Sequence, residues 1–165
     1  MNVLRAALDP CRSGHPEALR LLELAGEGVF EAGVPPQGVW ADFGADMSTP
    51  QGQRVLELLA YPGVVELQQL AVPSDVTFPG EDLFPEEPVQ CFGEAWIAVE
   101  TSWNGPGSKP GAQDRWYVES HVARRRDPLV TDDRGMRTMC DRLRDEYSFN
   151  VSAVSLDEYA ARFYI

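Results

Sequence analysis

The sequence predicts an α/β protein in which a parallel sheet is covered by helices on both faces. Short apolar segments alternate with segments whose apolar residues recur at helical spacing, and glycine and proline separate one from the next. The chain has 165 residues, 44 % of them hydrophobic, which is enough for one core without disulfide bonds. We therefore expect a single domain over residues 1–165.

The first part of the chain is predicted to begin with a strand. Residues 3–8 form a short apolar run that ends at Asp9. A helix should follow, because Pro16 suits a first turn and Gly26 and Gly28 suit its end. Further strands are predicted at 29–34 and 64–70, and further helices at 37–43 and from Pro50 onward.

Residues 73–90 are rich in proline and acidic residues, and we expect them to form an excursion from the same domain. Residues 104–112 hold three glycines and two prolines, which predicts a loop. Strands are predicted at 128–131 and 149–154, and helices at 89–103, 114–124, 133–147 and from 156 onward. Ser155 should cap the last helix, with Glu158 completing a capping box.

Charge and composition exclude several classes of protein. The net charge of −12 argues against tight, non-specific binding of nucleic acid, although a bound metal ion would reverse the local charge. The three cysteines are far apart and form no CxxC, so we expect reduced thiols and no structural zinc. No apolar run could span a bilayer and no signal peptide is visible, so we expect a cytoplasmic protein that is not in a membrane.

Four aspartates are the candidate functional residues: Asp9, Asp42, Asp114 and Asp133. Asp9 and Asp133 follow predicted strands, and the other two lie in predicted helices. Ligands of parallel sheets bind beyond the carboxyl ends of the strands, where these side chains could meet. Carboxylates that crowd together repel one another unless cations neutralise them, and Mg²⁺ or Mn²⁺ accepts such hard oxygen ligands.

The segment 127–137, Asp-Pro-Leu-Val-Thr-Asp-Asp-Arg-Gly-Met-Arg, resembles the C-terminal signature of PIN domains. In that family a strand leads into Thr-x-Asp, an arginine and a helix. Asp133 matches the acid of this signature, Asp114 the preceding acid, and Asp9 the first acid. Asp42 matches a position where the family usually has Glu. Residues 151–159 also resemble the final strand and helix of the family, so the resemblance spans nearly the whole chain.

The resemblance implies a PIN-like three-layer sandwich and metal-dependent hydrolysis of RNA phosphodiester bonds. Asp9, Asp114 and Asp133 would hold Mg²⁺ or Mn²⁺, and Asp42 would complete the catalytic set. Thr131 would bind a carboxylate or a metal-bound water, and Arg134 a substrate phosphate. Many small members are VapC-like toxins, so RNA, an antitoxin and a second copy of the chain are the partners that the resemblance implies.

Each of these residues also has a purely structural interpretation. Asp9 stands before Pro10 and would suit a turn, whereas Asp114 and Asp133 would suit helix N-termini. Asp46 competes with Asp42, and Asp132 with Asp133. His121 lies within a predicted helix and is expected to have a packing or surface role.

Two other functions remain open beside the ribonuclease. The motif at Asp9 lacks the polar residues usual in the family, because Pro10 and Cys11 follow it. This departure favours a catalytically inactive PIN-like interaction scaffold. The strong negative charge favours an acidic inhibitor of a nucleic-acid-binding partner.

Overall fold

The computed structural model describes residues 2–33, 50, 53, 57, 64–65, 91–123 and 125–163. The predictions for the strand beyond 65, the helix at 37–43 and the excursion at 73–90 lie outside these residues. Pro50 is helical, as expected, and so are Gln53 and Glu57.

The described elements, in chain order, are α1 (Asn2–Leu8), α2 (His15–Gly26), β1 (Ala32–Gly33), β2 (Val64–Val65), α5 (Glu94–Thr101), α6 (Ala112–Ala123), β3 (Leu129–Val130), α7 (Arg134–Tyr147), β4 (Ala153–Val154), α8 (Leu156–Ala160) and the 3₁₀ turn η4 (Ala161–Phe163).

The described part is an α/β structure with more helix than strand, and its strands are parallel. β1 pairs with β2 through Ala32 and Val64, and β3 pairs with β4 through Leu129 and Ala153. The parallel pairing is therefore confirmed. The described strands form two separate two-stranded sheets and not one continuous central sheet.

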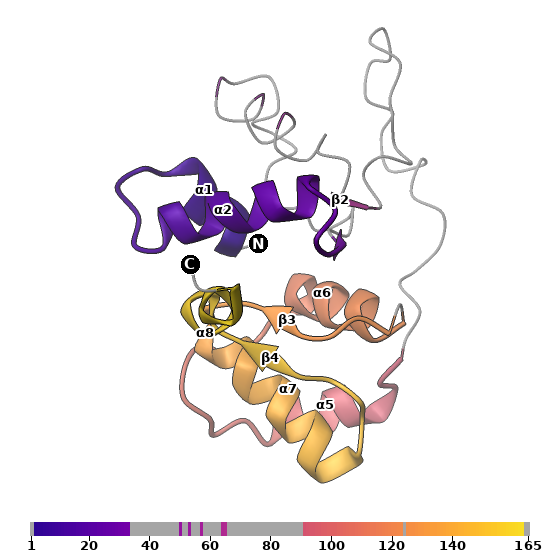
Figure 1. Cartoon of the computed structure of the whole chain (residues 1–165). Coiled ribbons are helices and arrows are strands. Elements are labelled where there is room, and N and C mark those ends of the chain that lie inside the picture. The colour runs from indigo at the N-terminus through magenta and orange to yellow at the C-terminus, as the bar shows by residue number, and fades with distance from the viewer. Residues whose placement is uncertain are drawn as a thin grey trace, which may run out of the picture.

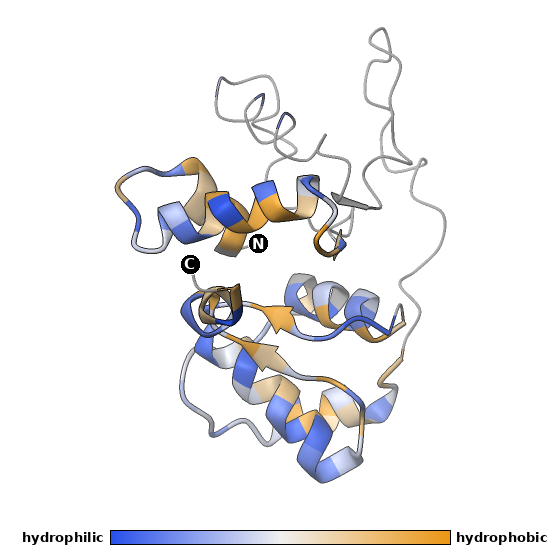
Figure 2. Ribbon diagram, in the orientation of Figure 1, coloured by the Kyte–Doolittle hydropathy of each residue, from blue (hydrophilic) through white to orange (hydrophobic). Residues whose placement is uncertain are grey.

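The helices lie on both sides of the β3–β4 pair. In Figure 1, α1 and α2 lie on one side of these strands, and α5 and α7 lie on the other. Figure 2 shows hydrophobic residues on both strands and mainly hydrophilic residues along the outer turns of α7. The inner face of α7 buries Met136, Met139, Cys140 and Leu143, whose spacing of three and four residues is helical.

The prediction of a strand at residues 3–8 is wrong, because this segment is helix α1. Leu4, Ala6, Ala7 and Leu8 are buried while Arg5 is exposed. Leu4, Ala7 and Leu8 lie at i, i+3 and i+4, positions that share one face of a helix. Alanine and leucine are also the strongest helix formers, which outweighs the short length of the apolar run.

Helix α2 has the predicted bounds and the predicted end. Pro16 lies in its first turn, and Leu21, Leu22 and Ala25 are buried. Gly28 has a φ of 78°, the left-handed conformation that glycine adopts readily. Its N–H donates to Ala25 O at 3.0 Å, and Val29 N–H donates to Leu24 O at 3.0 Å, which together form a Schellman end. Val29 therefore belongs to the end of the helix, and the strand predicted from residue 29 starts only at Ala32.

Two clusters of buried side chains form the core. The first joins α1 and α2 to α8, where Leu156 is 1 % exposed. The second joins α5, α6 and α7, with Trp96, Val118 and Met139 among its members. Helices α5, α6, α7 and α8 lie close to their predicted positions, and α8 begins with the capping box of Ser155 and Glu158. The loop predicted at 104–112 is confirmed up to Gly111.

Candidate functional site

The edge of the sheet at the carboxyl ends of β3 and β4 holds several of the predicted residues. Thr131, Asp132 and Asp133 follow β3 directly and lead into α7. Ser155 follows β4 and leads into α8. Because the two strands are parallel, both turns lie at the same edge.

Asp133 is the N-cap residue of α7. Its Oδ1 accepts a hydrogen bond from Met136 N at 3.0 Å, and its own N–H donates to Thr131 Oγ1 at 3.2 Å. Its Oδ2 accepts no hydrogen bond from the described residues. The carboxylate, which is only partly buried, thus has one oxygen engaged in capping and one oxygen available to a ligand.

Asp132, the residue that competes with Asp133 for the site, contacts a different helix. Its Oδ1 accepts a hydrogen bond from Leu156 N at 2.9 Å, at the first residue of α8. Asp132 is exposed, whereas Thr131 between β3 and this turn is only 3 % exposed. The two neighbouring aspartates therefore bind the N-terminal turns of two different helices.

Two arginines, Arg134 and Arg137, lie in the first turn of α7. Arg137 Nη1 lies 3.8 Å from Glu158 Oε2, and Arg134 at the start of α7 is exposed. Hydrogen bonds from the backbone and the hydroxyl of Ser155 lower the pKa of Glu158, and Arg137 lowers it further. The edge thus combines acidic groups with guanidinium groups that can reach an anionic ligand.

Asp9 does not end a strand, because the helix α1 precedes it. The residue is exposed, and its Oδ1 accepts a hydrogen bond from Cys11 N at 3.0 Å. Its carbonyl oxygen accepts another from Arg12 N at 2.9 Å. Asp9 therefore forms the turn that links α1 to α2, as the structural interpretation of its sequence expected.

Asp114 lies in the first turn of α6 and is partly buried. Its Oδ2 accepts a hydrogen bond from Gly111 N at 2.8 Å, which closes the N-terminus of the helix. Asp42 and its competitor Asp46 lie outside the described residues.

The acids that the structure describes do not complete a metal site. Among these residues, no three side chains of His, Cys, Asp or Glu are grouped so that they could hold a metal ion. Asp9, Asp114 and Asp133 are therefore not brought together as a set of three ligands. Each of them instead satisfies backbone N–H groups close to it in sequence.

A cavity elsewhere in the molecule was not predicted from the sequence. It has a volume of about 330 Å³ and is lined in part by His121 and Arg126. His121 is 6 % exposed and so is buried and not at the surface, and Arg126 is partly buried. The only sequence signal was a histidine and an arginine near the end of one helix, which is too common a pattern to indicate a site.

Comparison of the chain with known protein families, with curated proteins and with solved structures finds no match. Within the described ranges, no helix has both the length and the apolar character needed to cross a bilayer.

Proposed function

We propose that this chain is a metal-dependent endoribonuclease with a PIN-like three-layer fold and a reaction centre at the carboxyl ends of β3 and β4. One observation carries the proposal: Asp133 stands at that edge next to Thr131, with Oδ2 outside the helix cap. The resemblance to PIN domains also supports the proposal, because the acidic residues occur along the chain in the order of that family. RNA is the proposed substrate, and an antitoxin and a second copy of the chain are the proposed partners.

Residues at this edge have distinct roles in the proposal. The hydroxyl of Thr131 accepts the N–H of Asp133 and so fixes the backbone that carries the carboxylate. Arg134 is exposed beside it and binds a phosphate of the RNA. The proposed metal is Mg²⁺ or Mn²⁺. Because the described acids do not form a set of ligands, the proposal requires Asp42 and a rearrangement that brings in Asp9 and Asp114.

The test is cleavage of single-stranded and structured RNA by the purified chain, with Mn²⁺ and with EDTA. The matched variants are Asp133→Asn and Asp132→Asn, which remove neighbouring charges and keep an oxygen for each helix cap. We expect cleavage with Mn²⁺ only, a loss of about 100-fold in Asp133→Asn, and less than about threefold in Asp132→Asn. Absence of metal-dependent cleavage, or full activity of Asp133→Asn, would refute the proposal.

A catalytically inactive PIN-like interaction scaffold is the second candidate. It is favoured by the separate local roles of Asp9, Asp114 and Asp133 as turn and cap residues. Calorimetric titration with Mn²⁺ distinguishes the two candidates. Tight binding that Asp114→Ala abolishes supports the nuclease, and absence of binding supports the scaffold.

A further inference from the structure

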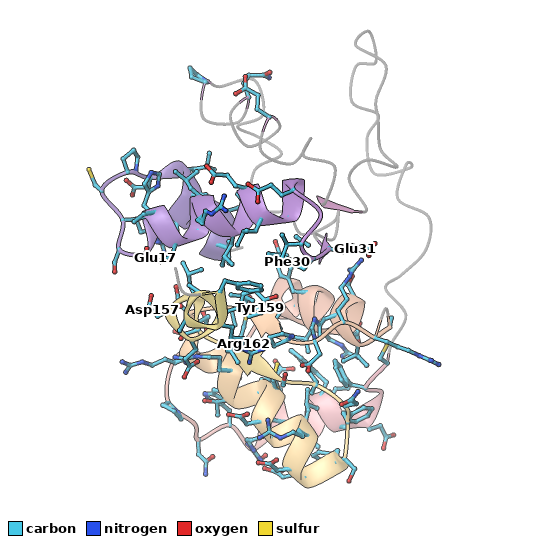
Figure 3. All side chains as sticks on the ribbon, viewed as in Figure 1. Glu17, Phe30, Glu31, Asp157, Tyr159 and Arg162 are labelled. Atoms are coloured by element: carbon cyan, nitrogen blue, oxygen red, sulfur yellow. The ribbon has the colours of Figure 1, made fainter. Side chains whose placement is uncertain are left out.

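A second candidate site lies away from the sheet edge, in a cavity between two parts of the fold. Its walls come from α1, α2 and β1 on one side and from α6, β3 and α8 on the other. Figure 3 labels Phe30 and Tyr159 between α2 and α8, where their ring centroids lie 6.0 Å apart. Leucines of α1 and α2 also line the cavity: Leu4, Leu21 and Leu22. A volume of about 330 Å³ fits a small molecule, and this lining favours an apolar body.

His121 brings a buried polar atom to this cavity. The residue lines the cavity and is 6 % exposed, and its Nε2 has no hydrogen-bond partner among the described residues. Burial lowers the pKa of His121 to about 4, while Asp127 acts in the opposite direction and Arg126 reinforces the effect of burial. The imidazole is therefore neutral at pH 7. A buried polar atom without a partner costs free energy, so a hydrogen bond from a ligand to this atom would remove that cost.

The charged residues around the cavity disfavour a charged ligand. Glu31 and Asp127 line it together with Arg126, so an anion would meet two carboxylates and a cation would meet the guanidinium. Arg126 already has an interaction partner, and the Asp127 carboxylate accepts a hydrogen bond from the hydroxyl of Ser152. Glu31 is exposed, where water screens its charge. Because moving a charge out of water is costly unless an opposite charge pairs with it, the lining favours a ligand without net charge.

The neutral imidazole indicates which polar group the ligand needs. In a neutral imidazole one ring nitrogen donates a hydrogen bond and the other accepts one, so Nε2 of His121 is a donor or an acceptor according to the tautomer. A hydroxyl group both donates and accepts, and it can therefore pair with this nitrogen in either tautomer. Alcohols and phenols are also neutral at pH 7, which agrees with the mixed charges of the lining.

We propose that this cavity binds a small neutral alcohol or phenol, with its hydroxyl group hydrogen-bonded to Nε2 of His121 and its apolar body among the side chains of α1, α2 and α8. The proposal concerns a different part of the molecule from the proposed ribonuclease centre and does not depend on that function.

The first test compares four probes that share an ethylphenyl group: para-ethylphenol, ethylbenzene, para-ethylbenzoate and para-ethylbenzylamine. Each is titrated at pH 7 into the full isotope-labelled chain, and chemical shifts are followed by NMR. We expect saturable binding of para-ethylphenol, with shifts at Gly33 and His121, and at least about fivefold weaker binding of the other three probes. Absence of saturable binding by para-ethylphenol, or equal or tighter binding of any other probe, would overturn the proposal.

The second test removes the ring nitrogens of His121. His121→Phe keeps an aromatic ring but cannot form the hydrogen bond, so the preference for para-ethylphenol over ethylbenzene should fall by at least about fivefold. His15→Gln is the control and should leave this preference unchanged, because His15 forms a hydrogen bond with Ala6 O and lies outside the residues that line the cavity. An undiminished preference in His121→Phe would contradict the proposed contact.

A third measurement needs no variant and keeps the proposal falsifiable if His121→Phe does not fold. The Nε2 resonance of His121 should shift more on saturation with para-ethylphenol than with ethylbenzene, because only the phenol forms a hydrogen bond. Intermolecular NOEs from the ethyl group of para-ethylphenol should reach the methyl groups of Leu21 and Leu22, which line the cavity. Binding without these NOEs, or equal Nε2 shifts with the two probes, would rule out this mode of binding.

Discussion

The guanidinium of Arg126 lies against the backbone of Gly33, so closely that a Cβ on residue 33 would meet its Cζ at 2.1 Å. The contact joins the end of the β1 strand to the segment that follows α6, two parts of the chain that are distant in sequence. A glycine at this position therefore determines where a charged group lies in the cavity.

Gly33→Ala should displace the Arg126 guanidinium. An arginine side chain is flexible, so we expect a shift of its position and a loss of stability below about 1 kcal/mol. The Nε–Hε resonance of Arg126 in an arginine-labelled sample should move, and the resonance of Arg144 should stay unchanged. An unmoved Arg126 resonance would show that the contact is not present in solution.

His121 should make the protein less stable in mildly acidic solution. Burial lowers the pKa of its imidazole in the folded state from 6.5 to about 4. The unfolded chain therefore binds more protons between these values, so the contribution of His121 is present above pH 6.5 and is lost as the pH falls toward 4. The shift corresponds to a loss of up to about 3 kcal/mol.

Urea unfolding at pH 7, 6, 5 and 4.5 measures this effect. His121→Gln should have a smaller decline in the free energy of unfolding over this range than the unmodified chain. His15→Gln retains His121 and should keep the decline. Identical pH profiles for His121→Gln and the unmodified chain would contradict the assignment.

Asp133 stabilises α7 through its cap, separately from any chemistry. Asp133→Ala removes the acceptor for Met136 N and should lower the free energy of unfolding by about 1 kcal/mol. Asp133→Asn and Asp133→Ser keep a capping oxygen and should have smaller effects. Chemical denaturation of the three variants checks this order, and equal stability of all three would show that the cap contributes little.

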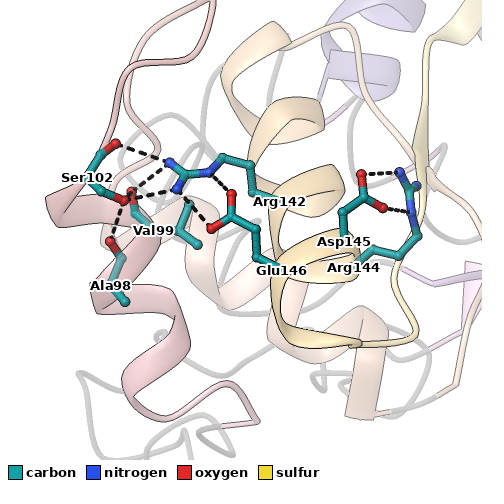
Figure 4. Close-up of polar contacts among 7 residues, drawn as sticks. All are labelled: Ala98, Val99, Ser102, Arg142, Arg144, Asp145 and Glu146. Atoms are coloured by element: carbon teal, nitrogen blue, oxygen red, sulfur yellow. Dashed lines mark hydrogen bonds and ion pairs between the residues drawn. The ribbon is translucent and has the colours of Figure 1, made fainter.

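Arg142 connects the end of α5 to α7. Its guanidinium donates to Ser102 O at 3.2 Å and to Ser102 Oγ at 3.0 Å, and Figure 4 shows that it also contacts Glu146. Arg142→Ala should lower the free energy of unfolding by about 1 kcal/mol, because carbonyl groups at the end of α5 lose their donor.

Arg144 is the matched control for Arg142 on the same helix. It pairs with the neighbouring Asp145 and with Asp141 at the exposed surface, also visible in part in Figure 4. Arg144→Ala should change the free energy of unfolding by less than about 0.5 kcal/mol. Thermal unfolding of both variants tests the comparison, and an effect of Arg144→Ala as large as that of Arg142→Ala would contradict it.

Gly135 allows the loop before α6 to pack on α7. A Cβ on this residue would lie 1.9 Å from the backbone oxygen of Ser108, which cannot move as a side chain could. Gly135→Ala should therefore lower the free energy of unfolding by about 2 kcal/mol, even though alanine favours helices. At Gly111 the nearest atom would be 4.0 Å away, so Gly111→Ala should cost less than about 1 kcal/mol. Urea unfolding of both variants measures the difference, and equal losses would contradict the steric argument.

The sequence predicted those elements whose ends carry strong local signals. Gly28 marks the end of α2, and Ser155 with Glu158 marks the start of α8, because capping depends on residues within one turn. The segment of α1 has no such signal, and its short apolar run predicts a strand although it forms a helix. Short apolar segments remain ambiguous until their packing partners are known.

The candidate site was less predictable than the fold. An aspartate after a strand or before a helix suits both a cap and a metal ligand, and its residue type does not distinguish the two uses. Asp9 and Asp114 hold turns and helix ends in the structure. The cavity at Arg126 depends on a contact with Gly33 that spans most of the chain, so no local pattern could indicate it.

The turn after β3 holds two helices by two adjacent side chains, Asp132 for α8 and Asp133 for α7. Inserting or deleting one residue here would move each carboxylate away from the backbone N–H group that donates to it. The first turns of α7 and α8 would then both lose a hydrogen-bond acceptor. The orientations of α7 and α8 are thus linked through a single dipeptide. The hydrogen bonds to the first turns of α7 and α8 are a sufficient reason for two consecutive acids at this edge, whether or not the edge is also a reaction centre.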